Sequence, residues 1–283
     1  MTGPRLLIVG FGDIGQRVSQ LLAPAGWDVH AVRRRPEPLN TFITWHQADY
    51  TAPNSLDFAE ALQPDFVLTT LTPLSMDISG YESGFATATR NLLQGLGDHP
   101  AKRIIMASST RVYAETNGGW VDESSPLSTS DQRALAIIDA EQQLLQGQRP
   151  ASIIRFGGIY GTPGGRLVKK VLAGRISPPM PVRYTNRIHR DDCAGFIAHL
   201  LLQAQAGEEL QSIYNGVDDC PVSAHEVESW LALKLACEPV NDSAPTVAPP
   251  SHKRCRNGAL RASGYPLQFP DYKSGYQSVL DHS

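Results

Sequence analysis

Cysteine is scarce in this sequence, and long apolar runs are missing from it. The cysteines are too widely spaced for a zinc pattern and too few for a disulfide framework, so we expect reduced thiols and no metal site; they are Cys193, Cys220, Cys237 and Cys255. No apolar stretch approaches the length that spans a bilayer, and no signal peptide precedes the first expected strand. These absences predict a cytoplasmic protein with no membrane partner.

The charges are nearly balanced, and no repeat or low-complexity tract is present. A net charge of -3 over 283 residues offers no electrostatic basis for binding nucleic acid or an anionic membrane surface. With 41% hydrophobic residues the chain can bury a full core, as one large domain or as one domain with an appendage.

Strand and helix patterns alternate along the first half of the chain. Expected strands cover 6–9, 28–32, 43–48, 65–70, 103–108 and 152–155, and expected helices cover 13–22, 55–62, 80–96 and 131–146. This alternation predicts an α/β fold, a Rossmann doubly wound parallel sheet with helices on both faces.

Beyond residue 156 the sequence becomes richer in glycine and proline. Helices are expected near 167–173, 191–203 and 223–235, a strand near 212–214, and a surface loop over 240–251. We therefore expect a Rossmann domain over 1–161, to which 186–216 return, and a smaller C-terminal substrate lobe made of 162–185 and 217–283. That arrangement would place Arg187 and His189 opposite Ser109 across a cleft.

A glycine-rich turn directly follows the first strand. The turn comprises Gly10, Phe11, Gly12, Asp13, Ile14 and Gly15. Gly10 permits a tight exit from the strand, Gly12 lets the backbone approach a pyrophosphate, and Gly15 lets the next helix lie close to the sheet. A plain strand-to-helix connection is the alternative, but the position between the first strand and a second one favours dinucleotide binding.

The second strand ends in Arg33, Arg34 and Arg35, with no carboxylate. NAD sites usually carry an acidic residue here that binds the ribose 2′-hydroxyl, whereas arginine accommodates the 2′-phosphate of NADP. A solvated basic loop is the alternative. Arg33 and Arg34 beside the glycine turn favour NADP, with NAD the second choice, while Arg35 precedes a proline and is the best candidate for a solvated side chain.

Five further motifs occur in the order and spacing of one enzyme family. They are SSTRVY at 108–113, DESSP at 122–126, RFGGIYG at 155–161, RIHRDD at 187–192 and IYNG at 213–216. The chain resembles the extended short-chain dehydrogenases/reductases, which include nucleotide-sugar epimerases and dehydratases. The resemblance covers nearly the whole chain. The glycine turn departs from it, because extended members usually space these glycines as Gly-x-x-Gly-x-x-Gly.

The resemblance implies a catalytic tyrosine and, four residues later, a lysine that lowers the phenol pKa. Counted back from Ala140 and Glu141, these positions hold Arg133 and Ile137. Arginine stays protonated and isoleucine has no proton to offer. No tyrosine lies between 113 and 160 and no lysine between 102 and 169, so the chain resembles an atypical member.

The remaining site residues are expectations from the motifs and the strand ends. Ser109 matches the catalytic Ser/Thr, with a local backbone contact as the alternative. Asp49 matches an adenine-binding acid, with a turn cap as the alternative. Further expected cofactor contacts are Leu71, Thr72, Ser108, Phe156 and Gly157, and expected substrate contacts are Tyr184, Arg187 and His189.

His189 and Tyr113 are the only candidates to replace the missing proton-transfer group, and we favour scaffold roles for both. Three functions compete. The chain is an NADP-dependent oxidoreductase or epimerase relative with a nonstandard acid or base, a non-catalytic NADP(H) sensor or regulatory protein, or a structural protein that has lost its ligand. The glycine turn and Arg33 argue against the third. The substrate is an unidentified small molecule, and a homodimer is left open.

Overall fold

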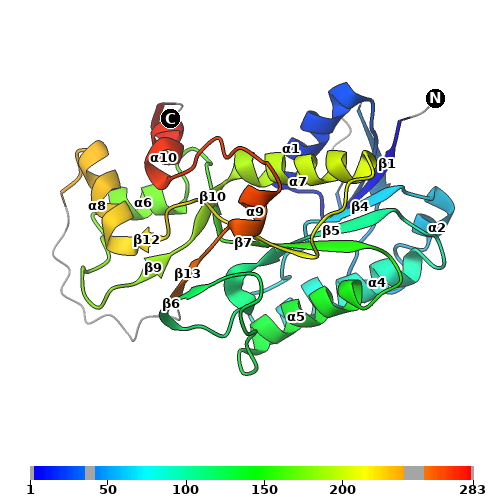
Figure 1. Ribbon diagram of the computed structural model, residues 1–283, viewed down its shortest axis with the longest axis horizontal. Coiled ribbons are helices and arrows are strands. Elements are labelled where there is room, and N and C mark those ends of the chain that lie inside the picture. The colour runs from blue at the N-terminus through cyan, green and yellow to red at the C-terminus, as the bar shows by residue number, and fades with distance from the viewer. Residues whose placement is uncertain (1–2, 36–41, 239–251, 282–283) are drawn as a thin grey trace. The chain divides into compact units, whose positions relative to one another are not determined.

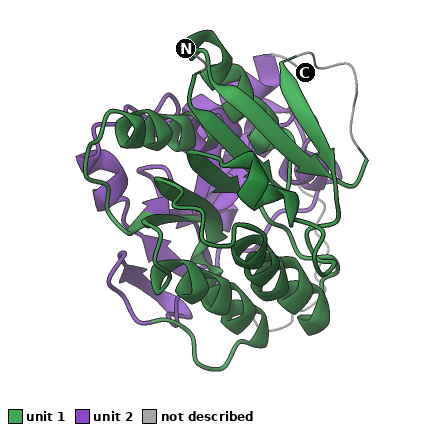
Figure 2. Cartoon of the chain, turned by 90° about the vertical axis from the view of Figure 1, so that its right-hand side faces the viewer, with its two compact units in different colours: residues 1–112, 127–155, 194–214 green, residues 113–126, 156–193, 215–283 purple. Residues whose placement is uncertain are grey.

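The computed structural model describes residues 3–35, 42–238 and 252–281. Contacts divide the chain into two compact units, coloured separately in Figure 2. Unit 1 comprises Met1–Val112, Leu127–Arg155 and Ala194–Tyr214, and unit 2 comprises Tyr113–Pro126, Phe156–Cys193 and Asn215–Ser283. These limits differ from the expected ones, because 113–126, 156–161, 186–193 and 215–216 fall in unit 2. The loop expected over 240–251 lies outside the described residues.

A seven-stranded sheet carries unit 1, in the order β11-β7-β5-β4-β1-β2-β3. Its strands are β1 (Arg5–Val9), β2 (Asp28–Arg33), β3 (Ile43–Gln47), β4 (Phe66–Thr69), β5 (Arg103–Ser109), β7 (Ala151–Phe156) and β11 (Ile213–Gly216). The pairs from β3 through β5 are parallel, and the order reverses beside β1. This doubly wound sheet confirms the expected Rossmann fold.

The central strands are buried on both faces, which explains their continuous apolar sequences. Leu6, Leu7 and Ile8 of β1 are fully buried, and a parallel sheet of this kind needs helices on each side. Figure 1 shows α1 and α7 along one side and α4 and α5 along the other. The helices are α1 (Asp13–Leu22), α2 (Phe58–Leu62), α4 (Ala88–Gly95), α5 (Gln132–Leu145) and α7 (Arg190–Gln205).

The helix expected over 80–96 is present, with an irregular start. It begins as α3 (Ile78–Tyr81), passes through one π-helical segment, η2 (Glu82–Thr87), and continues as α4. Asp77 caps α3, since its Oδ1 accepts the backbone N–H of Gly80 at 2.7 Å.

Unit 2 is built from short strand pairs that the sequence pattern does not reveal. β8 (Gly158–Tyr160) pairs with β10 (Arg187–His189), β9 (Tyr184–Thr185) with β12 (Val222–Ser223), and β6 (Asn117–Val121) with β13 (His252–Cys255). Its helices are α6 (Arg166–Leu172), α8 (Ala224–Lys234), α9 (Gly258–Ala262) and α10 (Tyr272–Asp281). Strands of two to five residues are too short for a clear alternation of apolar and polar side chains.

Helices α6, α8 and α10 supply a separate hydrophobic core for unit 2. It is made of Val168, Val171, Val227, Leu231, Ala232, Tyr272 and Tyr276. Among the described helices, none has both the length and the apolar character needed to cross a membrane.

Candidate functional site

The glycine turn between β1 and α1 has the geometry that its three glycines predict. Gly10 has φ +89°, and a Cβ there would lie 2.6 Å from the carbonyl oxygen of Thr70. A Cβ at Gly15 would lie 3.2 Å from side-chain atoms of Ile8 and Phe11. At Gly12 a Cβ would meet nothing within 4 Å. Gly10 and Gly15 are therefore required by packing, whereas Gly12 borders open space.

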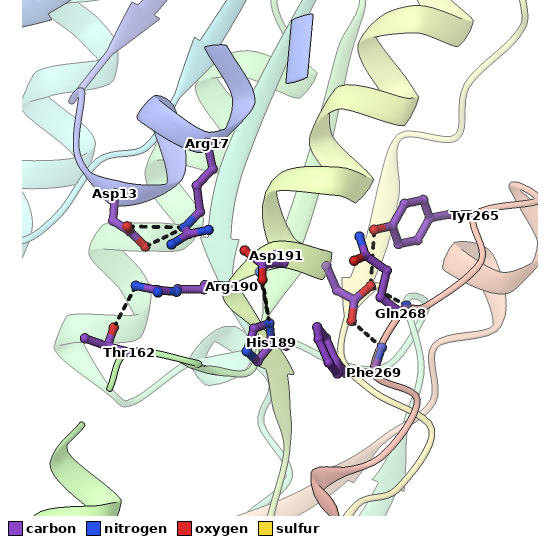
Figure 3. A network of polar contacts seen from close by, with 10 residues as sticks. Asp13, Arg17, Thr162, His189, Arg190, Asp191, Tyr265, Gln268 and Phe269 are labelled. Carbon is purple, nitrogen blue, oxygen red and sulfur yellow. Dashed lines mark hydrogen bonds and ion pairs between the residues drawn. The ribbon is translucent and has the colours of Figure 1, made fainter. Parts of the chain in front are cut away.

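The first turn of α1 can accept a phosphate group. No side chain caps the helix, so its leading N–H groups are free of a side-chain acceptor. Asp13 brings a negative charge to this end, and Arg17 offsets it, because the Arg17 Nε lies 3.3 Å from Asp13 Oδ1 (Figure 3). The residues present therefore fit the pyrophosphate of a dinucleotide.

The end of β4 lies against the same turn. The hydroxyl of Thr70 donates to the carbonyl oxygen of Gly10 at 2.6 Å, which joins the two strand ends. Leu71 is buried and Thr72 is exposed. Of the two residues expected to contact the cofactor, Thr72 is the one whose side chain is accessible, at the carboxyl edge where ligands bind in such sheets.

Arg33 and Asp49 lie at the ends of the neighbouring strands β2 and β3. Arg33 is half-buried, and Arg34 and Arg35 are exposed. Asp49 Oδ1 accepts the N–H of Thr51 at 3.0 Å and its hydroxyl at 2.7 Å, which is the turn-capping role. Burial acts to raise the pKa of Asp49, but the Thr51 hydrogen bonds and the charge of Arg34 outweigh it and lower the pKa. The adenine contact of Asp49 stays a prediction.

Ser108, expected beside the cofactor, directs its side chain into the protein. Its hydroxyl donates to Glu141 Oε1 at 2.5 Å. Glu141 also accepts from Arg155, whose Nη2 lies 2.7 Å from Oε2, and both members of this ion pair are buried. In the sequence, Glu141 served only to align the helix and was not expected to pair with a charge. Its structural partner, Arg155, lies on β7.

Ser109 is the half-buried last residue of β5, and its hydroxyl proton has no acceptor among the described residues. Its Oγ accepts the backbone N–H of Arg111 at 3.2 Å. On α5, Ile137 is buried in the core, whereas Arg133 is half-buried with its guanidinium carbon 5.8 Å from the ring centroid of Tyr81. Tyr81 is absent from the sequence interpretation, because no motif marks it.

His189 and Tyr113, the alternative proton-transfer residues, are buried and contact other residues of unit 2. The His189 ring contacts Phe269 with centroids 4.1 Å apart, and its Nδ1 lies 3.5 Å from Asp191 Oδ2 (Figure 3). The Tyr113 hydroxyl donates to Asn215 Oδ1 at 2.6 Å and is buried. These contacts support the scaffold roles.

Asp192, the last residue of the RIHRDD motif, also holds unit 2 together. Its carboxylate is buried and accepts the N–H groups of Gln268 at 2.7 Å and Phe269 at 2.9 Å and the hydroxyl of Tyr265. Burial raises the pKa of Asp192, and the three hydrogen bonds oppose that rise. Asp192 therefore stabilises the structure of unit 2 through these hydrogen bonds.

Arg187 is buried, unlike the solvated arginine that a loop position suggests. Its guanidinium donates to the Thr185 hydroxyl and lies 5.5 Å from the ring centroid of Tyr272. Near it, the Asp218 Oδ2 is buried without a hydrogen bond among the described residues, and burial raises the pKa of Asp218 to about 7. With Arg187 and His189 only 5% and 3% exposed, little of either side chain can face a substrate.

The remaining expected site residues of unit 2 are Tyr184, Phe156 and Gly157. Tyr184 is half-buried and stacks on Arg254, whose guanidinium carbon lies 4.4 Å from the tyrosine ring centroid. Phe156 is buried at the end of β7, and a Cβ at Gly157 would lie 2.9 Å from the backbone of Asn186. Ser109 belongs to unit 1 and His189 to unit 2, so their expected apposition stays a prediction.

Within the described ranges, no group of three or more potential ligating His, Cys, Asp or Glu residues could hold a metal ion. Unit 1 thus brings together the glycine turn, Thr72, the ends of β2 and β3, and Ser109 on one sheet. The turn and the strand ends suit a dinucleotide, and Ser109 supplies a hydroxyl that can contact a substrate.

Comparisons with known proteins agree with this arrangement. A family model described as NAD(P)H-binding matches residues 10–204. Protein YeeZ of Escherichia coli K12 is 27% identical over 219 residues, covering 74% of this chain and 77% of that protein. The human epimerase family protein SDR39U1 is 25% identical over 236 residues, covering 80% and 78%.

Among solved structures, a Methylobacillus flagellatus protein classed with the NAD-dependent epimerases/dehydratases is 30% identical. It covers 100% of this chain and 99% of its own, with a TM-score of 0.83. The match extends through both units. The chain therefore belongs to the NAD(P)H-binding family and is an atypical extended short-chain dehydrogenase/reductase.

Proposed function

We propose that this protein binds NADP(H) in preference to NAD(H). The observation that carries the proposal is Arg33 at the end of β2, beside a glycine turn with open space at Gly12. The human SDR39U1 was solved with NADPH, and MoeE5 was solved with NAD. These neighbours are 19% and 21% identical, so they support the fold only. The preference for NADP(H) is argued from the arginines of this chain.

The residues of unit 1 fit the parts of the dinucleotide. The first turn of α1 would hold the pyrophosphate, and Arg33 and Arg34 would bind the 2′-phosphate. Asp49 would contact the adenine, and Thr72 would line the cofactor cleft at the carboxyl ends of the strands. When bound, a nicotinamide nucleotide supplies a hydride acceptor or donor. Ser109 would contribute its unpaired hydroxyl proton as a hydrogen bond to a substrate carbonyl or hydroxyl.

We propose an oxidoreductase or a relative of the nucleotide-sugar epimerases, with an acid or base other than the usual tyrosine. The segments 162–185 and 217–283 would form most of the substrate side, with Tyr184 as a contact. A non-catalytic NADP(H) sensor is the second candidate, because α5 contains neither tyrosine nor lysine and Ile137 is buried in the core. The substrate side, a homodimer and a cytoplasmic location are parts of this proposal.

Thermal denaturation with NADPH or NADH tests the cofactor. At a free concentration about 100-fold above Kd, NADPH should add roughly 2.7 kcal/mol to the free energy of unfolding. Arg33→Asp should remove or reverse the preference. Arg90→Asp makes the same charge change at an exposed site on α4 and should leave it unaltered. Equal shifts with both nucleotides would refute the preference.

Turnover then separates the two candidates. We expect no ordinary epimerase or dehydratase turnover of UDP- or dTDP-sugars, because a missing positioned acid/base typically costs about 10²–10⁴ in rate. Stoichiometric NADPH oxidation by a carbonyl substrate, lost in Ser109→Ala, would support the oxidoreductase. Tight NADPH binding with no oxidation of the nucleotide across a panel of carbonyl compounds would support the sensor.

A further inference from the structure

Two arginines meet one tyrosine ring beside Ser109. Arg133, near the start of α5, has its guanidinium carbon 5.8 Å from the ring centroid of Tyr81. Arg111, in the short helix η3 (Thr110–Val112) that follows β5, has its own 5.9 Å from the same centroid. All four residues belong to unit 1. The cluster therefore rests on the same sheet and helices as the glycine turn.

The two guanidiniums differ in their electrostatic partners. Arg111 Nη2 forms an ion pair with Asp131 Oδ2 at 2.8 Å. The Arg133 guanidinium forms no hydrogen bond or ion pair within the described part of the chain. The charge of Arg133 helps to lower the pKa of Asp77, whose Oδ1 already accepts the hydroxyls of Ser75 and Ser79 and the N–H of Gly80. The N–H groups of Arg133 are thus available to a ligand.

Packing prepares Arg133 for recognition of an anion. Tyr81 is 8% exposed and is itself held by Phe85, with ring centroids 5.8 Å apart. A guanidinium resting on an aromatic face keeps its fork of N–H donors at the edge, which matches the two oxygens of a carboxylate or phosphate. Half-burial of Arg133 also reduces the competition from water for those donors.

We propose that Arg133, supported by Arg111 and Tyr81, binds an oxyanion group of the substrate, a carboxylate or a phosphate ester. Arg133 occupies the helix position that matches the proton-transfer tyrosine of the resembled family, and this position would then bind the negative charge of the substrate. The inference rests on the proposed function only in giving Ser109 a substrate. The Ser109 Oγ accepts the N–H of Arg111, which leaves its hydroxyl proton to donate to a carbonyl or hydroxyl of the substrate next to the anionic group.

NMR of the arginine Nε–H groups tests this directly. The Arg133 signal, assigned by its loss in Arg133→Gln, is followed during titration with inorganic phosphate, acetate or chloride, with and without NADPH. NADPH occupies the other phosphate site, at the glycine turn. We expect saturable shifts with phosphate or acetate and none with chloride at equal ionic strength. Equal shifts with chloride would overturn the proposal, whether or not NADPH binds.

Three sugars that differ only at carbon 6 identify the source of the anion. Glucuronate presents a carboxylate, glucose 6-phosphate a phosphate ester, and glucose neither. The apparent affinity, taken from the titration of the Arg133 signal, should be at least 10-fold higher for one of the two anionic sugars than for glucose. In Arg133→Lys the affinity, read from the Ser109 amide, should fall less than in Arg133→Gln, and in Arg90→Gln it should not change. An unchanged affinity in Arg133→Gln would refute the site.

Discussion

Gly10 and Gly12 are two positions apart in one turn, yet a methyl group would have different consequences at each. Gly10 has φ +89° and its Cβ direction leads to the Thr70 carbonyl oxygen at 2.6 Å. Gly12 has φ -120° and a clear Cβ direction. The first glycine is therefore needed by the fold, and the second is needed only if a ligand approaches the backbone.

We expect Gly10→Ala to lower the free energy of unfolding by about 1–3 kcal/mol, because alanine is strained at that φ and meets the Thr70 carbonyl. Gly12→Ala should leave urea denaturation nearly unchanged and weaken NADPH binding in calorimetry. Gly26 provides the control for backbone strain alone, because it has φ +74° with nothing within 4 Å of its Cβ direction. A Gly12→Ala variant that binds NADPH as tightly as the wild type would remove Gly12 from the cofactor site.

At the scale of elements, α5 is fastened to the sheet by a buried ion pair. Glu141 on α5 contacts Arg155 on β7 and Ser108 on β5, and its side chain is only 1% exposed. Removing one member of such a pair leaves an uncompensated buried charge. The same helix carries Arg133 in its first turn, so its attachment also positions the Arg133 side chain.

Arg155→Met should therefore lower the free energy of unfolding by about 3–5 kcal/mol. Glu141→Leu should have a similar effect, whereas the double variant should be more stable than either single one, because no charge is left buried. Urea denaturation of the four proteins gives the coupling free energy. Losses that simply add in the double variant would show that the two side chains act independently.

At the scale of the whole molecule, each unit is assembled from three separate stretches of chain, so its stability depends on long-range packing. Asp218 shows this dependence in unit 2. Its Oδ1 accepts the N–H of Cys220 at 3.1 Å, but burial raises its pKa to about 7 against the favourable charge of Arg187. The folded protein thus holds a proton on Asp218 that the unfolded chain releases near pH 4.

This difference makes the stability depend on pH. Because the folded-state pKa is the higher one, the stabilisation from protonated Asp218 is complete below about pH 4 and is lost as the pH rises to about 7. Relative to Asp218→Asn, the wild type should lose stability between pH 5 and pH 7 and then level off. Asp98→Asn, which removes an exposed carboxylate in unit 1, should follow the wild-type curve. A constant difference between wild type and Asp218→Asn from pH 5 to pH 8 would contradict the raised pKa.

Much of unit 1 could be predicted, because its elements follow from local patterns. Apolar runs such as 6–9 and 103–108 form buried parallel strands, and the expected helix over 13–22 coincides with α1. The strand pairs of unit 2 escaped prediction. β9 and β12 have two residues each, so their pairing depends on partners far apart in the sequence rather than on any local period.

Residue types and their spacing predict the parallel sheet, the glycine turn with its separate demands at Gly10 and Gly12, the arginines at the end of β2, and the lack of tyrosine and lysine on α5. Each depends on residue type and spacing within a few neighbours. Long-range packing, in contrast, makes Ser108 turn inward to Glu141, buries Arg187, and brings Arg111 and Arg133 to the ring of Tyr81. Those outcomes depend on which distant side chains fill the same space, and local sequence patterns do not encode that choice.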